Sequence, residues 1–325
     1  MKNQTSFNTP SVVKSIASSD SRPLVSVMIP TYNCAKFLIK TLESVLSQDL
    51  GENLMEIEVI DDCSTIDNPE LIVKQYGNGR VRFSQNQKNL GAPENFNTCI
   101  NRSNGKLVHI LHGDDYILPF FYQLIINEFE DDNDLGICIT RSLIIDEYDN
   151  LIEMSPRISN LEKSSKNHKF LFYENPIRTP SIVVKREVYE KIGGFIPSLI
   201  HTSDWEMWNR AISSTKGLFL NKPLVCYRYF PSNDTGRLAS TGDNLVDYIR
   251  LGNILKTKYQ DFSFIKFYQN VVHLALNQAE MFKKLGNNDS YQTNYEIYKK
   301  LRKKLPLFLF IREHLKMYYR AFLKL

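Results

Sequence analysis

The stretch Gly105-Lys106-Leu107-Val108-His109-Ile110-Leu111-His112-Gly113-Asp114-Asp115 is an apolar segment that ends in two adjacent carboxylates. The apolar part predicts a buried strand, so Asp114 and Asp115 lie where a strand gives way to a loop. Hard cations such as Mg²⁺ and Mn²⁺ are commonly held by one or two carboxylates together with substrate phosphates. Adjacent acids also occur at exposed turns and helix starts, and residues 116–119 are compatible with a helix start. The pair is a candidate metal site whose meaning depends on the surrounding motifs.

Strand-like and helical patterns alternate along the first part of the chain. Apolar runs at residues 24–29, 56–60, 81–83 and 107–111 predict four strands. Apolar residues at helical spacing predict two helices between them: Leu38, Leu42, Val45 and Leu46 in one, Ala92, Phe96, Cys99 and Ile100 in the other. This alternation indicates an α/β fold with a mainly parallel sheet, whose ligands bind outside the carboxyl ends of the strands. Asp61-Asp62 and Asp114-Asp115 both fall at such ends.

Composition indicates a soluble globular protein with one large or two modest domains, because the 325 residues are 42% hydrophobic and 23% charged. The five cysteines are widely spaced and form no C-x-x-C pair, which argues against a disulfide framework or a zinc cluster and favours a reducing, cytoplasmic location. Residues 1–22 are rich in Ser, Thr and Asn and lack the apolar core of a signal peptide. We expect them to form a flexible leader.

Four motifs follow one another in an order that resembles a known family. They are VSVMIPTYN at 25–33, EVIDDCS at 58–64, NLG at 89–91 and the acid pair at 114–115. Together they are similar to the nucleotide-binding half of family 2 glycosyltransferases, which have the GT-A fold. The resemblance extends from about residue 24 to about residue 230. It implies a Rossmann-like mixed sheet flanked by helices over residues 23–240, with a nucleotide-binding half at 23–118 and an acceptor-binding half at 119–240.

The resemblance implies which residues hold the nucleotide. Pro30, Thr31, Tyr32 and Asp62 match the family positions that contact base and ribose. The chemistry of the side chains agrees, since a tyrosine ring can stack on a base and a carboxylate can accept a hydrogen bond from a uracil N–H.

The same comparison implies that Asp115 ligates a divalent ion, Mn²⁺ or Mg²⁺, and that Asp114 contacts the ribose or the metal. The family usually has Asp-x-Asp-Asp here, whereas this chain has His112 in place of the first acid. We favour a buried, hydrogen-bonded role for His112 over a metal role. A second departure follows Gly91, where the family's Arg is missing.

Asp204 is the candidate general base. Ser203 and Glu206 have the spacing of a helix capping box, which places Asp204 in the first turn of a helix, where the helix dipole favours a carboxylate. An acid at a helix start with no other role is the alternative. The family has an acidic residue in a Glu-Asp-x-x-x-x-x-Arg pattern, which residues 203–210 match with Ser203 in place of Glu. By this resemblance, Asp204 accepts the proton of the attacking hydroxyl.

Two further segments have competing interpretations. Arg228, in Tyr227-Arg228-Tyr229, resembles a residue that closes over the diphosphate, although a solvated surface arginine is the alternative. The polar stretch at residues 155–175 is either an acceptor-side loop or a surface insertion, and its lack of periodicity favours the insertion.

The C-terminal region, residues 241–325, is predicted to be helical and to end in a basic amphipathic tail. Residues 299–325 contain nine Lys or Arg residues and one acid; because the whole chain has a net charge of +4, the preceding residues carry −4. Bulky aromatics on the apolar face of the tail favour an anionic membrane surface over nucleic acid as its partner. Packing on the chain's own domain or on a partner subunit is the alternative.

These features lead us to expect an inverting glycosyltransferase that uses a nucleotide-diphosphate sugar, with UDP as the expected nucleotide. Its acceptor would be a hydroxyl of a glycan or a lipid-linked molecule in cell-surface polysaccharide synthesis, at the cytosolic face of the membrane. A nucleotidyltransferase would need a Gly-rich or basic phosphate loop after the first strand, and residues 30–33 do not form one. A non-catalytic module that binds a nucleotide sugar or acts as a scaffold is the second alternative.

Overall fold

The computed structural model describes residues 8–16, 21–230 and 233–305. The chain divides into two compact units, residues 1–230 and 231–325, and each is described by itself. The division falls earlier than the boundary predicted after residue 240. The helix that begins at Asp234 is the reason, because its hydrogen-bonding partners lie in the second unit.

One mixed sheet of nine strands forms the centre of the first unit, in the order β3-β2-β1-β4-β8-β6-β9-β5 with β7 paired to β6. The strands are β1 (Val25–Thr31), β2 (Met55–Asp61), β3 (Val81–Gln85), β4 (Leu107–Ile110), β5 (Tyr116–Ile117), β6 (Leu135–Ile145), β7 (Leu151–Met154), β8 (Ile182–Lys185) and β9 (Lys216–Arg228). The GT-A type of mixed sheet implied by the resemblance is confirmed.

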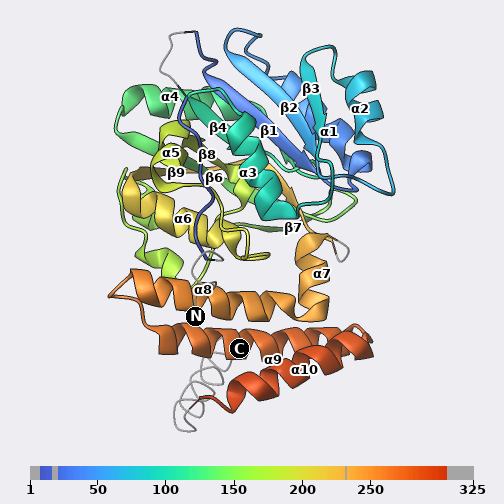
Figure 1. Cartoon of the computed structure of the whole chain (residues 1–325), viewed down its shortest axis with the longest axis vertical. Coiled ribbons are helices and arrows are strands. Elements are labelled where there is room, and N and C mark those ends of the chain that lie inside the picture. The colour runs from blue at the N-terminus through green and yellow to red at the C-terminus, as the bar shows by residue number, and fades with distance from the viewer. Residues whose placement is uncertain (1–7, 17–20, 231–232, 306–325) are drawn as a thin grey trace. The chain divides into compact units, whose positions relative to one another are not determined.

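The first four strands are parallel, and all four strands predicted from apolar runs are present (Figure 1). Every residue of β1, β2 and β4 is buried, as expected for parallel strands covered on both faces. Strand β3, at the edge, is only partly buried. In register, Thr31 lies opposite Asp61 and Met28 opposite Ile110, so β1 is held between β2 and β4.

The second half of the sheet departs from the predicted, mainly parallel arrangement. Strand β8 runs antiparallel to both β4 and β6, and β6 is parallel to β9. Residues 116–117, considered above as a helix start, instead form β5 and pair with β9. Antiparallel pairing reverses the chain direction beside β4, and it joins the strands after residue 118 to the four parallel strands in one sheet.

Helices cover the sheet of the first unit: α1 (Ala35–Leu46), α2 (Pro69–Tyr76), α3 (Ala92–Arg102), α4 (Phe121–Asp131), α5 (Arg186–Ile192) and α6 (Ser203–Ser214), with 3₁₀ turns η1 (Ser159–Leu161), η2 (Lys169–Phe172) and η3 (Thr179–Ser181). Helices α1 and α3 confirm the two predictions from apolar spacing. Helix α2 was not predicted, although Asn68 caps it by accepting a hydrogen bond from the Leu71 N–H, and Pro69 occupies its first position.

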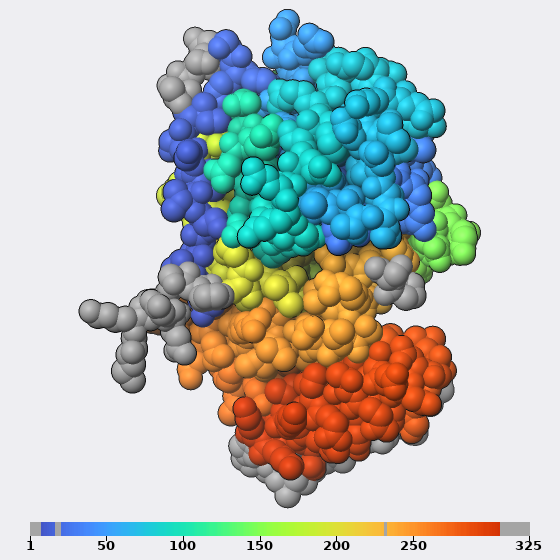
Figure 2. Space-filling model, turned by 45° about the vertical axis from the view of Figure 1, so that its right-hand side comes forward, coloured from blue at the N-terminus to red at the C-terminus, as the bar shows by residue number. Residues whose placement is uncertain are grey.

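Part of the predicted leader follows a defined path along the first unit (Figure 2). Ser11 N–H donates to Phe195 O, Ser11 O accepts from Gly194 N–H, and Asn97 donates to the Ser11 hydroxyl. The side chain of Val13 is 6% exposed. The prediction that residues 1–22 form a flexible leader is therefore wrong for residues 8–16, because these contacts fix that segment.

The second unit is helical, as predicted, and contains α7 (Asp234–Thr241), α8 (Asp243–Lys258), α9 (Phe264–Lys284) and α10 (Asn288–Arg302). A buried amide network connects these helices: Gln278 donates to Ala239 O and to Asn294, and Asn244 donates to Gln278. Residues 306–325, most of the predicted basic tail, lie outside the described residues. Within the described ranges, no helix is both long enough and apolar enough to cross a membrane.

Replacing Leu42 with Ala should test how strongly α1 stabilises the sheet. The Leu42 side chain is 0% exposed, so its truncation leaves a cavity, and we expect the free energy of unfolding to fall by about 2–5 kcal/mol. Leu71→Ala is the matched control, because Leu71 is 58% exposed. The chain's two tryptophans both lie in α6, so tryptophan fluorescence during urea unfolding follows the first unit. Equal effects of the two substitutions would contradict the packing described.

Candidate active site

The carboxyl ends of three neighbouring strands form the floor of the site. Thr31 O, at the end of β1, accepts a hydrogen bond from Asp62 N–H at 2.8 Å, and Pro30 O accepts one from Gly113 N–H at 3.0 Å. The turn after β1, the end of β2 and the acid loop after β4 therefore meet at one edge of the sheet, as their positions in the sequence predict.

Helix α1 fixes the loop that contains the two acids. The Thr41 hydroxyl lies 3.1 Å from Gly113 O and 2.7 Å from Asp115 O. Gly113 allows this close packing, since a Cβ there would collide with Thr31 Cγ2 and lie 3.0 Å from Cys34 Sγ. The two acids are thus placed by a buried backbone rather than by a free loop.

His112, Asp114 and Asp115 have a donor set that fits a divalent cation. Their ligand atoms all lie within 4.8 Å of one another. Asp115 is 1% exposed; its Oδ1 accepts a hydrogen bond from Arg228 N–H at 2.6 Å, while its buried Oδ2 has no hydrogen-bond partner and lies 3.2 Å from His112 Nδ1. Oδ2 pairs with the His112 ring in this geometry, and a divalent cation bound by both side chains would replace that contact.

The close packing of these groups shifts two of their pKa values. Burial and the charge of Asp115 raise the pKa of Asp114 to about 7. Burial disfavours the charged imidazole of His112, but the Asp115 carboxylate outweighs burial and raises the pKa of His112. The ring of His112 stacks on Phe96, with the ring centroids 5.2 Å apart. His112 is therefore packed, as predicted, and it also belongs to the donor set.

The predicted nucleotide residues differ in their freedom to contact a ligand. Tyr32 is 44% exposed and is available for stacking. Pro30 and Thr31 are buried, so their side chains are not available to a ligand. The Asp62 carboxylate accepts hydrogen bonds from the N–H groups of Leu90 and Gly91, so it orders the loop after β3, and a base contact would be additional to this function.

Arg228 is buried and is not a solvated surface residue. It is 2% exposed, and its guanidinium donates to Asp114 O, to Asp146 O and to Asp149 Oδ1. It also lies over the ring of Phe37, 4.4 Å from the centroid. The predicted phosphate contact would require the guanidinium to leave these acceptors. In the geometry observed, Arg228 clamps the acid loop to the β6–β7 turn.

Helix α6 presents Asp204 in its first turn, as predicted, but without the predicted capping box. The N-cap is Thr202, with no side-chain cap hydrogen bond, and Ser203 is the first helical residue. Glu206 does not reach back to the cap because it pairs with Arg210, one turn on, at 2.8 Å. The Arg210 guanidinium also donates to the carbonyls of residues 192–194 and holds the start of α6 against that turn.

Asp204 is chemically suited to accept a proton. Its Oδ1 accepts from Trp205 N–H at 2.7 Å, and its Oδ2 accepts from Asn175 Nδ2 at 3.2 Å. Burial raises the pKa of Asp204 to about 6, against opposing effects from the Trp205 N–H, Arg178, His112 and Asn175. A raised carboxylate pKa makes it a stronger base that is still ionised at neutral pH.

Residues 26–193, more than half of the chain, match the family model described as glycosyl transferase family 2. The chain belongs to glycosyl transferase family 2. This enzyme is 29% identical to the chondroitin synthase of Escherichia coli over 212 residues, which cover 63% of this chain and 28% of that protein. It is 29% identical to an uncharacterised glycosyltransferase of Methanocaldococcus jannaschii over 78% of this chain and 89% of that one.

Solved structures show the same fold. TarS residues 1–349 of Staphylococcus aureus, in complex with UDP-GlcNAc, align with a TM-score of 0.58 and 17% identity over 85% of this chain and 91% of that one. A mannosyltransferase of Pyrobaculum calidifontis, in complex with GDP-Man and Mn²⁺, aligns with a TM-score of 0.54 and 17% identity over 93% and 84% of the two chains. At this identity the similarity concerns the fold.

The prediction that residues 155–175 form a surface insertion is wrong for this glycosyltransferase. The segment is no loose surface insertion, since Leu161 and Leu171 are fully buried and Leu171 O accepts hydrogen bonds from Trp205 and Asn209 of α6. Asn175 and Arg178, which border Asp204, were missed. No motif or periodicity marks them, because a loop places them there.

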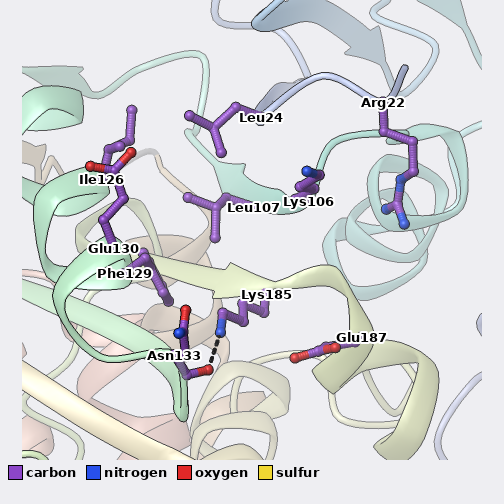
Figure 3. Close-up of a pocket in the computed structure, with 10 residues that line it drawn as sticks. All are labelled: Arg22, Leu24, Lys106, Leu107, Ile126, Phe129, Glu130, Asn133, Lys185 and Glu187. Atoms are coloured by element: carbon purple, nitrogen blue, oxygen red, sulfur yellow. Dashed lines mark hydrogen bonds between the residues drawn. The ribbon is translucent and has the colours of Figure 1, made fainter. Parts of the chain in front are cut away.

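A cavity of about 300 Å³ lies at the opposite edge of the sheet (Figure 3). Leu24 and Leu107, beside the starts of β1 and β4, form its apolar wall, and Arg22, Lys106 and Lys185 line it as cations. None of the predicted site residues lines this cavity. The predicted site residues therefore lie at the strand ends, away from this cavity.

Arg228→Gln should separate a structural clamp from a phosphate contact. Loss of the buried guanidinium leaves two carbonyls and Asp149 Oδ1 without the donor they share, although Lys40 still pairs with Asp149 Oδ2, so we expect the free energy of unfolding to fall by about 2–4 kcal/mol. Urea unfolding followed by tryptophan fluorescence measures it. Arg157→Gln, which removes an exposed ion pair with Glu162, should have little effect. Unchanged stability with weakened UDP binding would instead favour the phosphate contact.

Proposed function

We propose that this enzyme is an inverting, metal-dependent glycosyltransferase that moves a sugar from a UDP-sugar to a hydroxyl of a glycan or lipid-linked acceptor. The observation that carries the proposal is the cluster of His112, Asp114 and Asp115 at the carboxyl edge of the sheet, whose ligand atoms all lie within 4.8 Å of one another. The family model supports the reaction class. Structural neighbours in complex with UDP-GlcNAc, or with GDP-Man and Mn²⁺, support a nucleotide-sugar donor and a divalent ion.

Donor binding is assigned to the strand ends. The exposed ring of Tyr32 would stack on the base, and Pro30, Thr31 and Asp62 would shape the base and ribose site. Asp114 and Asp115, with His112 beside them, would hold Mn²⁺ or Mg²⁺. Such an ion, when bound, offsets the negative charge that grows on the leaving diphosphate.

Asp204 is assigned as the general base. The acceptor oxygen forms a bond to the anomeric carbon as the bond from that carbon to the diphosphate oxygen breaks, which inverts the configuration. The hydroxyl proton passes to Asp204, whose pKa of about 6 leaves the carboxylate ionised at neutral pH. Asn175 and the Trp205 N–H hold the two carboxylate oxygens and thereby orient the base.

The acceptor class and the site of action are also proposals. Relatives include the chondroitin synthase of Escherichia coli, the hyaluronan synthase of Pasteurella multocida and a poly(ribitol-phosphate) β-N-acetylglucosaminyltransferase of Staphylococcus aureus. These names support polysaccharide synthesis as the process. We place the reaction at the cytosolic membrane face, with the basic tail as a membrane contact, because a lipid-linked acceptor would require it.

Thermal shift with nucleoside diphosphates tests the donor site. UDP with Mn²⁺, at about a hundred times its dissociation constant, should raise the melting temperature by about 5 °C or more, because ligand binding stabilises the native state. GDP, CDP and dTDP should have weaker effects. Asp115→Asn should remove the metal-dependent part of the shift, whereas Asp131→Asn, an exposed acid at the end of α4, should not. No shift with any nucleotide would count against the donor site.

The substitution Asp204→Asn tests two statements: that Asp204 is the general base, and that the protein is an enzyme and not a non-catalytic binding module. We expect it to lower kcat at least a hundredfold, by roughly the contribution of general base catalysis, while UDP binding persists. In the wild type, kcat/KM should be maintained above pH 6 and fall as the pH drops through about 6, because Asp204 becomes protonated. UDP release from UDP-GlcNAc measures turnover, and the exposed Glu174→Gln is the control. Equal turnover by wild type and Asp204→Asn would exclude Asp204 as the base.

A further inference from the structure

We propose that Arg178 forms an anion subsite beside Asp204, so that this enzyme recognises a carboxylate or phosphate on its acceptor. The inference rests on the proposed role of Asp204 as the base, and it specifies the acceptor as an anionic glycan. The residues that carry it are Asn175, Arg178, Asp204 and Tyr227.

The loop between η2 and η3 brings Arg178 to the base. Asn175 Nδ2 donates to Asp204 Oδ2 at 3.2 Å, and Asn175 O accepts a hydrogen bond from Arg178 Nη1 at 3.3 Å. Asn175 Oδ1 also accepts from Ile177 N–H, which keeps the loop turned toward α6. The carboxylate and the guanidinium thus share Asn175 as a common neighbour, and Arg178 is close enough to lower the pKa of Asp204.

Arg178 has unused hydrogen-bonding capacity, unlike several other arginines of the first unit. Arg186, Arg210 and Arg228 each form an ion pair with a carboxylate. For Arg178, no ion pair is found within the part of the chain that the structure describes, and its buried Nε has no hydrogen-bond acceptor there. The Asp204 carboxylate is the nearby negative charge, but Arg178 forms no hydrogen-bonded pair with it among the described residues, so a carboxylate or phosphate of a ligand could accept from its remaining N–H groups.

Tyr227 orients the guanidinium for such a ligand. The Cζ atom of Arg178 lies 5.5 Å from the centroid of the Tyr227 ring, which belongs to β9. A guanidinium held by a ring and a carbonyl loses little freedom when it binds, and its planar fork matches a carboxylate or phosphate. The site therefore favours an anionic group with two oxygens in one plane.

The position of Arg178 favours the acceptor over the donor as the source of the anion. The donor diphosphate is assigned to the cluster at Asp114 and Asp115, which has its own cation site. Asp204 contacts the acceptor hydroxyl in the proposed reaction, and Arg178 borders Asp204 on the Asn175 side. An anionic acceptor would be repelled by the Asp204 carboxylate unless a cation beside it offset that charge.

An array of paired glycans tests the subsite directly. The full-length protein, with UDP and Mn²⁺, is applied to oligosaccharides that differ only in a uronate carboxylate or a phosphodiester. We expect the wild type to bind the anionic member of a pair about tenfold more strongly, and Arg178→Gln to reduce that binding to the level of the neutral member. Arg178→Lys should keep part of the preference. Arg157→Gln removes the same charge from an exposed position and should change nothing.

Three results would overturn the proposal. One is the absence of any preference for anionic glycans, including the absence of all glycan binding. Another is an equal loss of neutral and anionic binding in Arg178→Gln, which would make Arg178 a positioning residue for Asp204. The third is a selective loss of UDP-glucuronate over UDP-glucose binding, which would assign the anion to the donor. Calorimetric measurement of UDP binding separates failure of the subsite from failure of the proposed function. If one of these results is obtained and UDP still binds, only the subsite proposal is overturned. If UDP does not bind, the proposed function is overturned as well.

Discussion

The parallel pairing of β1 with β2 on one side and β4 on the other is the constraint on which the site depends. Parallel strands in register end at the same edge, so three turns that are remote in sequence meet there. Hydrogen bonds from Asp62 N–H and Gly113 N–H to the end of β1 fix these turns relative to one another. The antiparallel strand β8 then continues the same sheet from β4 to β6.

Much of this arrangement could be predicted because apolar strands and helices have distinct periods, and because acids after strands mark carboxyl ends. The structure places Asp62 just after β2, Asp115 in the loop after β4 and Asp204 in the first turn of α6, which are the positions predicted from the sequence. The surroundings of these residues were harder to predict, since they depend on contacts between distant segments. Arg228 pairs with Asp149, and Glu206 pairs with Arg210 instead of closing a cap. Arg178 lies in a loop whose path only tertiary packing determines.

Charge is balanced differently on the two sides of the site. On one side, two neighbouring carboxylates and His112 gather donor atoms that a cation would unite. On the other side, a single carboxylate, Asp204, is held by neutral donors, with a guanidinium nearby. This asymmetry suits a reaction in which a polyanion leaves on one side and a hydroxyl loses its proton on the other.

The contact between Arg228 N–H and Asp115 Oδ1 has a consequence for biosynthesis of the protein. Asp115 and Arg228 are far apart in the chain, and β9, which ends at Arg228, pairs with β5 and β6 of the same sheet. A nascent chain that has not yet emerged through β9 lacks a partner that fixes the Asp115 carboxylate. Long-range pairing of this kind forms late in folding, so the Asp115 carboxylate would reach its final position only after nearly the whole first unit has been synthesised.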